Sequence, residues 1–240
     1  MYAFEGVARP VLFEHENPDF PYWGKGSSFL LANSNHYYWI TAKHVITNMG
    51  GSADMLRIFP DDGSRISLPF NESYLISAEG LDDEDYKDIY ALRVDLSEFE
   101  ENGDAPLSAQ DIEAGILAAE KLLENDEIWI IGYPSESNSV DFDSCAIKNT
   151  RSVIRATYQG NSLSQHCHTA RIETSINLSN YDGLSGSPVF FLKTVMNGEQ
   201  QIQLPLLVGM LLRGTATSSI VHFVSSSVIE RLIRLVEKDA

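Results

Sequence analysis

The sequence has few basic residues and no long apolar run. Lys and Arg total 17 against 34 Asp and Glu, which gives a formal net charge of −17 over 240 residues. Proteins that bind nucleic-acid backbones or anionic membranes need a basic face, so neither is expected as a partner. The longest apolar run, 204–212, is much shorter than the roughly 18 residues of a membrane span, and it suits a buried strand.

Cysteine is also scarce, with only Cys145 and Cys167. A secreted domain can bridge such a pair, but the first ten residues lack the basic start and apolar block of a signal peptide. We therefore expect two reduced thiols and a cytoplasmic location.

The acidic residues concentrate between Glu79 and Asp104. One interpretation is a solvated loop region that keeps the protein soluble. The other is a field that favours basic substrates or partners. Within this region, residues 82–85 form a hydrophilic run that is expected to be exposed, whereas Asp88 leads directly into an apolar strand pattern.

Short strand patterns occupy most of the chain. Residues 27–32 and 36–42 are rich in aromatic and β-branched side chains, and a turn signal at 33–35 joins them. Further patterns predict strands at 54–60, 64–70, 88–96, 127–134, 145–158, 166–176, 187–193, 204–212 and 219–224. Many short strands leave edges to protect, so two antiparallel units, each closed or nearly closed, are expected.

Two segments show helical spacing instead. Residues 106–125 predict a connector helix, with apolar side chains at Ile112, Ile116, Ala119 and Leu123. Serines precede a C-terminal helix at 225–240, whose apolar stripe is Val228, Ile229, Leu232, Ile233 and Val236. The expected organisation is therefore an N-terminal unit at 1–105, the connector at 106–125, a second unit at 126–224 and the C-terminal helix.

The stretch "YDGLSGSPVF" places Ser185 between glycines, directly before an apolar strand. A serine hydroxyl becomes a nucleophile when an adjacent base removes its proton, and the usual base is a histidine oriented by a carboxylate. His44 follows the strand pattern that ends at Thr41-Ala42, and Asp88 is the best-anchored acid of the acidic region. Taken singly, His44 also suits a core histidine and Asp88 a turn residue.

The other histidines are less suited by context. His166 and His168 alternate around Cys167, so their side chains would share one face of a strand. A metal site is conceivable there, but no second ligand pair is evident, so an ordinary strand is the preferred interpretation and no metal or cofactor is expected.

His44, Asp88 and Ser185 stand in the order His, Asp, Ser. "TAKH", "DIYAL" and "GLSGSPV" resemble the corresponding motifs of trypsin-like (chymotrypsin-fold) serine proteases, and "GSSFLL" and "WIIGYP" resemble the strands that open the two barrels in bacterial members. The resemblance covers about residues 20–235. An α/β-hydrolase is excluded because it needs the order Ser, acid, His, and because Ser187 stands where its last glycine belongs.

The resemblance implies an all-β fold of two antiparallel six-stranded β-barrels packed face to face, with the connector and C-terminal helices added. It implies a bacterial intracellular serine endopeptidase in which Ser185 attacks, His44 is the base and Asp88 orients His44. The N–H groups of Gly183 and Ser185 would form the oxyanion hole. A protein or peptide substrate and a regulatory protein partner are expected.

Two departures from the family limit what the resemblance implies. Leu184 replaces the aspartate that pairs with a newly cleaved N-terminus in digestive members, so the loop must hold its shape unaided or be ordered by something else. The specificity pocket is expected around Ser179, Arg213 and Gly214, and Arg213 or His222 would favour an acidic side chain.

Two other functions remain open. One is a non-catalytic or latent binding module with the same fold, activated by a partner. The other is an esterase that uses the same three residues.

Overall fold

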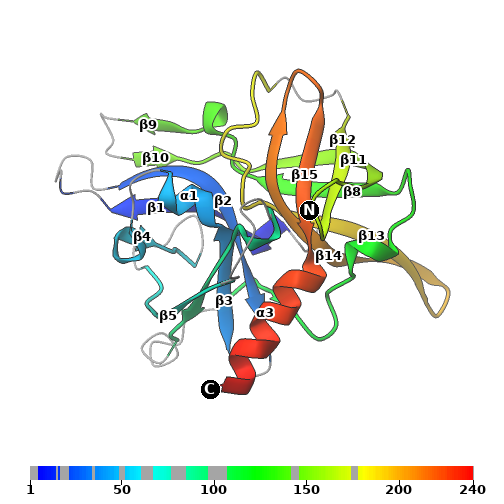
Figure 1. The fold of residues 1–240 in the computed structure, drawn as a ribbon, viewed down its shortest axis with the longest axis horizontal. Coiled ribbons are helices and arrows are strands. Elements are labelled where there is room, and N and C mark those ends of the chain that lie inside the picture. The colour runs from blue at the N-terminus through cyan, green and yellow to red at the C-terminus, as the bar shows by residue number, and fades with distance from the viewer. Residues whose placement is uncertain are drawn as a thin grey trace.

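The computed structural model describes residues 5–14, 16, 22–33, 36–48, 52–60, 67–76, 85–96, 107–141, 146–173 and 178–239. Figure 1 shows two β-units side by side, with a helix at the end of the chain running from the second unit toward the first. Over the ranges just given, every helix is too short or too polar to traverse a lipid bilayer.

The first unit is a sheet built around an antiparallel six-strand path. In spatial order the strands are β4 (Leu56–Arg57), β1 (Ala8–Glu14), β2 (Tyr22–Ala32), β3 (Tyr37–Ala42), β6 (Ile89–Val94) and β5 (Phe70–Leu75), and β7 (Gln110–Asp111) pairs with β2 in parallel. An isolated bridge between Ile58 and Leu68 brings the two ends of this path together. The predicted strands at 27–32 and 36–42 pair antiparallel, with Ala32 opposite Tyr37, while residues 34 and 35 of the predicted turn lie outside the described residues.

The second unit is a closed six-stranded barrel. Its strands run in the order β11 (Ser152–Asn161), β12 (Cys167–Ile172), β15 (Ile220–Ser225), β14 (Gln200–Thr215), β13 (Pro188–Asn197) and β8 (Glu127–Gly132). A separate ribbon is formed by β9 (Ser139–Asp141) and β10 (Ala146–Lys148). Closure leaves no sheet edge to protect, which confirms the expectation drawn from the many short strands.

Two apolar clusters form the core, and one of them spans both units. One fills the first unit and continues through Tyr133 and Met210 of the second, so the units share an interface of core character. The other fills the barrel of the second unit around Ile130 and Phe223. Each large apolar side chain that is fully buried contributes about 1.5–3 kcal/mol, so separating the units would expose substantial apolar surface.

The predicted C-terminal helix is confirmed as α3 (Ser226–Asp239), with Ile229 and Ile233 buried. It fastens the end of the chain to the first unit through the carboxylate of Glu237. That carboxylate accepts hydrogen bonds from the Tyr38 hydroxyl and from Asn33 Nδ2 at 2.8 Å, and it lies 2.9 Å from His36 Nδ1.

The predicted connector helix at 106–125 is wrong over its described part, 107–125. That segment contains β7, a turn and one short 3₁₀ turn at Ala119–Lys121. Its backbone pairs with β14 instead of with itself, since Leu117 N–H donates to the Leu207 carbonyl at 2.9 Å and Leu207 N–H donates to the Gly115 carbonyl at 2.8 Å. Gly115 also disfavours a helix interior, so pairing to β14 outweighed a weak local preference.

The cysteine and histidine predictions can be followed in part. Cys167 is a free, buried thiol, and burial raises its pKa to about 12. Cys145 and His15 lie outside the described residues. His166 has a left-handed backbone just before β12, and His168 is buried with Nδ1 2.8 Å from the Tyr158 hydroxyl. In the described part of the chain, no three His, Cys, Asp or Glu side chains are placed to hold a metal ion.

Burial lowers the pKa of His168, which makes the free energy of unfolding depend on pH. The unfolded chain takes up a proton at the ordinary histidine pKa of about 6.5, whereas the folded chain resists it. Stability should therefore fall as pH drops below about 6.5. We expect His168→Gln, which cannot titrate, to show a shallower fall in urea unfolding between pH 8 and pH 5.5. A slope equal to that of the wild type would contradict this assignment. His222, whose pKa burial also lowers, leaves a residual slope of the same sign.

Candidate active site

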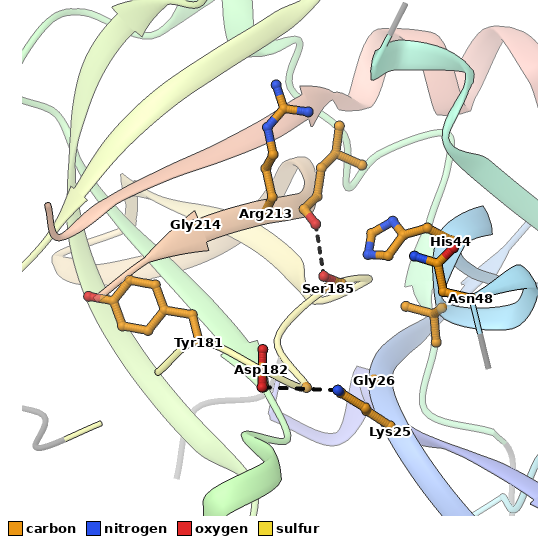
Figure 2. A pocket seen from close by; sticks show the side chains of 12 residues that line it. Lys25, Gly26, His44, Asn48, Tyr181, Asp182, Ser185, Arg213 and Gly214 are labelled. Carbon is orange, nitrogen blue, oxygen red and sulfur yellow. Dashed lines mark hydrogen bonds and ion pairs between the residues drawn. The ribbon is translucent and has the colours of Figure 1, made fainter. Parts of the chain in front are cut away.

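His44 lies where a rigid strand of the first unit meets a short helix. The strand β3 ends at Ala42, and α1 (Lys43–Thr47) begins immediately after it. Thr41 and Ala42 are fully buried, so the backbone that carries His44 is fixed by the core. The imidazole itself is about one-third exposed and points toward Ser185 (Figure 2).

Asp88 holds both the backbone and the ring of His44. One carboxylate oxygen accepts the His44 backbone N–H at 2.8 Å, and the other lies 2.5 Å from His44 Nδ1. The backbone contact satisfies an N–H at the start of α1 that has no partner within the helix. With the proton on Nδ1 donated to Asp88, Nε2 is left as the acceptor that faces the cleft.

Ser185 reaches the same cleft from the second unit. Its Oγ donates to the Leu212 carbonyl at 2.8 Å (Figure 2). The pairing of β14 with β15 shifts register between Leu211 and Arg213, so Leu212 falls at a bulge. Bulges redirect a strand's groups, which accounts for a carbonyl of β14 that turns toward Ser185 instead of toward the ladder.

The loop around Ser185 is fixed through its carbonyl groups. The Asp182 carbonyl accepts Ser135 N–H at 2.7 Å, the Leu184 carbonyl accepts Ser187 N–H at 3.0 Å, and the Ser185 carbonyl accepts Ser27 N–H at 2.8 Å. In the described part of the chain, by contrast, the N–H groups of Gly183 and Ser185 donate to no protein acceptor. A trans peptide directs N–H opposite to its C=O, so the anchored Asp182 carbonyl turns the Gly183 N–H the other way.

Ser27 of β2 is the anchor of this loop. It is fully buried, its backbone N–H binds the Ser185 carbonyl, and its Oγ donates to the Gly183 carbonyl at 2.7 Å. The same Oγ accepts Tyr133 N–H at 2.9 Å, and the Ser27 carbonyl accepts Thr41 Oγ1 at 2.7 Å. Ser27 of the first unit therefore binds both Gly183 and Ser185, the two residues whose N–H groups donate to no protein acceptor in the described part of the chain.

Two further residues adapt the loop to this anchor. Gly186 has φ of +87°, and a Cβ placed there would lie 1.9 Å from the Ser27 carbonyl oxygen, so only glycine fits. Leu184 is fully buried in the apolar cluster of the barrel. Apolar burial and the bonds to Ser27 thus hold the loop in place of the ion pair that a leucine cannot make.

A pocket of about 240 Å³ lies between the two units. It is lined by Lys25, Gly26, His44, Val45, Asn48, Tyr181, Asp182, Gly183, Ser185, Leu212, Arg213 and Gly214. An exposed ion pair, Lys25 with Asp182 at 4.0 Å, crosses from one unit to the other at its rim (Figure 2). The structure therefore brings together His44 and Ser185 in one cavity, with Asp88 directly behind the imidazole.

The predicted specificity residues separate into two groups. Arg213 and Gly214 line this pocket, and the Tyr181 ring lies against Gly214. Ser179 and His222 are not among its lining residues. Ser179 bonds to the Glu136 carboxylate, and His222 faces Ser162 Oγ at 3.4 Å. The Arg213 guanidinium binds Asp85, so the charge that a preference for acidic side chains would use is already neutralised.

Sequence reasoning missed two residues at this site. Ser27 was part of a strand pattern, and nothing local marks its role, because its partners lie more than 100 residues away. Asp85 was expected to be exposed with its acidic neighbours, but its side chain is only 10% exposed and binds Arg213 and Ser164. A charge count cannot separate the one anchored acid from the run, and residues 82–84 lie outside the described ranges.

The Ser27 anchor can be tested against its neighbour in the chain. Ser28 is equally buried, but its Oγ donates only to the Arg9 carbonyl, away from the loop. We expect Ser27→Ala to lower the free energy of unfolding by about 2–4 kcal/mol and Ser28→Ala by about 1–2 kcal/mol, since the first leaves two buried groups unpaired. Amide exchange at Gly186 and Ser187 should quicken in Ser27→Ala alone. Equal exchange in both variants would show that Ser27 does not hold the loop.

Comparison with known proteins was informative at the level of fold. No family model matches the chain, and no curated protein matches its sequence. The crystal structure of the scabies mite inactivated protease paralogue S-I1 matches with a TM-score of 0.59 and 14% identity, covering 100% of this chain and 98% of that one. Human heparin binding protein matches with a TM-score of 0.59 and 11% identity, covering 99% and 93%. The chain thus has the chymotrypsin-like two-barrel fold, while its chemistry has to be argued from its own side chains.

Proposed function

We propose that this protein is a trypsin-like serine endopeptidase that hydrolyses peptide bonds through an acyl-enzyme on Ser185. The observation that carries the proposal is that a hydrogen-bonded His44–Asp88 pair and Ser185 meet at one pocket. In the described part of the chain, the N–H groups of Gly183 and Ser185 beside them donate no hydrogen bond to a protein acceptor. The chymotrypsin-like fold accommodates such a site, but it is shared with an inactivated protease paralogue, so the proposal rests on the side chains and not on the fold.

In this mechanism His44 Nε2 takes the proton of Ser185 Oγ as that oxygen attacks the carbonyl carbon of the scissile bond. The Nδ1 proton stays on His44 and is donated to the Asp88 carboxylate, which stabilises the imidazolium that forms. His44 then gives the proton to the leaving amine, and the acyl group stays on Ser185. Water attacks the acyl-enzyme in the same way, with His44 again as base, and releases the acid and the free serine.

The N–H groups of Gly183 and Ser185 are the proposed oxyanion hole. Negative charge develops on the carbonyl oxygen in the transition state, and donors already oriented toward it stabilise that charge without reorganising. The loop carbonyls are fixed by Ser135, Ser27 and Ser187 before any substrate arrives. Loss of one such donor typically costs about 3 kcal/mol of transition-state stabilisation.

The alternative is a non-catalytic or latent module, and one observation favours it. The hydroxyl of Ser185 donates to the Leu212 carbonyl instead of to His44. A serine hydroxyl exchanges hydrogen-bond partners by rotation about its Cα–Cβ bond between staggered positions. Catalytic hydrogen bonds commonly tighten only when substrate is present, so this resting orientation is compatible with either function.

A protein or peptide is the proposed substrate, and a regulatory protein is the proposed partner. A bacterial origin and a cytoplasmic location remain predictions from the sequence. No cofactor or metal enters the proposed reaction, since the three side chains and the loop supply the base, the nucleophile and the charge stabilisation.

The proposal is tested by labelling with a fluorophosphonate probe. The wild type should react, whereas Ser185→Ala and His44→Ala should lose at least about 1,000-fold in labelling rate, because each removes a member of the nucleophile–base pair. The matched control is Ser187→Ala. In the described part of the chain its buried Oγ has no hydrogen-bond partner, so its removal should leave both labelling and stability nearly unchanged.

Labelling followed by cleavage of a peptide library would support the endopeptidase. Labelling with hydrolysis of small esters and no peptide cleavage would instead identify an esterase. A folded wild type that does not label at pH 8 would contradict the proposal and leave the latent module.

A further inference from the structure

Asp85 is a buried acid of the first unit that is held by the second. It begins η3 (Asp85–Lys87), the turn that leads directly into Asp88. Its carboxylate accepts hydrogen bonds from both terminal guanidinium nitrogens of Arg213, one of them at 2.6 Å. It also accepts a hydrogen bond from Ser164 Oγ at 2.8 Å. A guanidinium that binds both oxygens of a carboxylate fixes orientation as well as distance. The contact is therefore a geometrically defined link between the units.

On the side of the second unit, this link ends beside the nucleophile. Arg213 directly follows Leu212, whose carbonyl accepts the Ser185 hydroxyl. Leu212 falls at the bulge between β14 and β15, where the ladder holds the backbone least. Anchoring the Arg213 side chain therefore restrains the part of β14 that faces Ser185.

On the side of the first unit, the link ends at the base. The Asp85 carbonyl accepts Asp88 N–H at 3.0 Å, and the Asp88 carbonyl accepts Lys43 N–H at 3.2 Å. Asp88 in turn holds the His44 ring. The neighbouring Tyr86 ring meets the ring of His166 edge-on at 5.7 Å, so η3 rests on the second unit at two points.

We propose that Arg213 and Asp85 are positioning residues that lock η3 against β14 and so set the placement of the His44–Asp88 pair relative to Ser185. The catalytic consequence rests on the proposed function. The structural consequence, a fixed His44–Asp88 pair, can be measured without it.

The charges around the link strengthen it. Burial alone would raise the pKa of Asp85, but hydrogen bonds from Arg213 and Ser164 outweigh burial and lower it. Asp85 is therefore ionised at neutral pH, as a charge-assisted pair with a guanidinium requires.

The experiment measures the rate of fluorophosphonate labelling at pH 8 in Arg213→Ala, Arg213→Lys, Asp85→Asn and the double variant Arg213→Ala/Asp85→Asn. We expect both Arg213→Ala and Asp85→Asn to label about 10- to 100-fold more slowly, since small misplacements of reacting groups cost that much. Arg213→Lys should be intermediate because it keeps the charge and loses the paired geometry. The double variant should be no slower than the slower single variant, because both remove one link.

Urea unfolding of each variant separates positioning from general loss of stability, because a variant that is fully folded and still labels slowly has lost the placement of its reacting groups. Arg155→Ala is the matched control, because Arg155 also binds two carboxylates, Glu127 and Glu173, but within the second unit. Labelling rates within about twofold of the wild type in both single variants would overturn the proposal, because this threshold lies well below the expected 10- to 100-fold effect.

A readout independent of activity keeps this test apart from that of the proposed function. The downfield proton resonance of His44 Nδ1–H, assigned by its loss in His44→Ala, reports the bond to Asp88. It should broaden or disappear in Arg213→Ala and persist in Arg155→Ala, even if the wild type never labels. Its persistence in Arg213→Ala would overturn the proposed lock, whatever the labelling result.

Discussion

The buried residue Ser27 holds the candidate site in shape through its hydroxyl and its backbone N–H. Ser27 belongs to the first unit, yet it binds the carbonyl groups of Gly183 and Ser185 in the second. Ser135 and Ser187 bind the Asp182 and Leu184 carbonyls, which share peptide units with the N–H groups of Gly183 and Ser185, and in the described part of the chain these two N–H groups donate to no protein acceptor. Buried polar groups are costly without partners, so this network also fixes how the units meet. The geometry of the loop and the packing of the interface are thus consequences of the same contacts.

The site exists only where the two units join. His44 and Asp88 come from the first unit, and Ser185 from the second. The polar links that cross the junction or its flank include those from Ser27 to the loop, from Asp85 to Arg213, and from Glu237 of α3 to the first unit. The apolar interface gives most of the attraction, but it has no direction. The polar links fix the relative orientation of the two units, which a reaction between groups on separate units needs.

The sequence predicted most strands of this protein because their apolar and β-branched patterns reflect burial, but it missed β1 and most of β5, and the described part of the predicted strand at 64–70 holds only a bridge at Leu68 and the start of β5. It also placed His44, Asp88 and Ser185 correctly at strand ends and a glycine-rich loop. It failed at the connector, where Gly115 and Leu207 pair across some 90 positions and override helical spacing. It also failed for Ser27 and Asp85, whose roles depend on partners in the other unit. Long-range pairing leaves no local pattern, so single-sequence reasoning cannot find it.

The central claim is that the loop is already formed, with two N–H groups aimed where an oxyanion would lie. The most direct measurement is a structure of the protein phosphonylated at Ser185. The account predicts a phosphonyl oxygen about 2.7–3.1 Å from the nitrogens of both Gly183 and Ser185, with the Ser27 bonds intact. A phosphonyl oxygen that points away from these nitrogens, or a loop that has left Ser27, would contradict it.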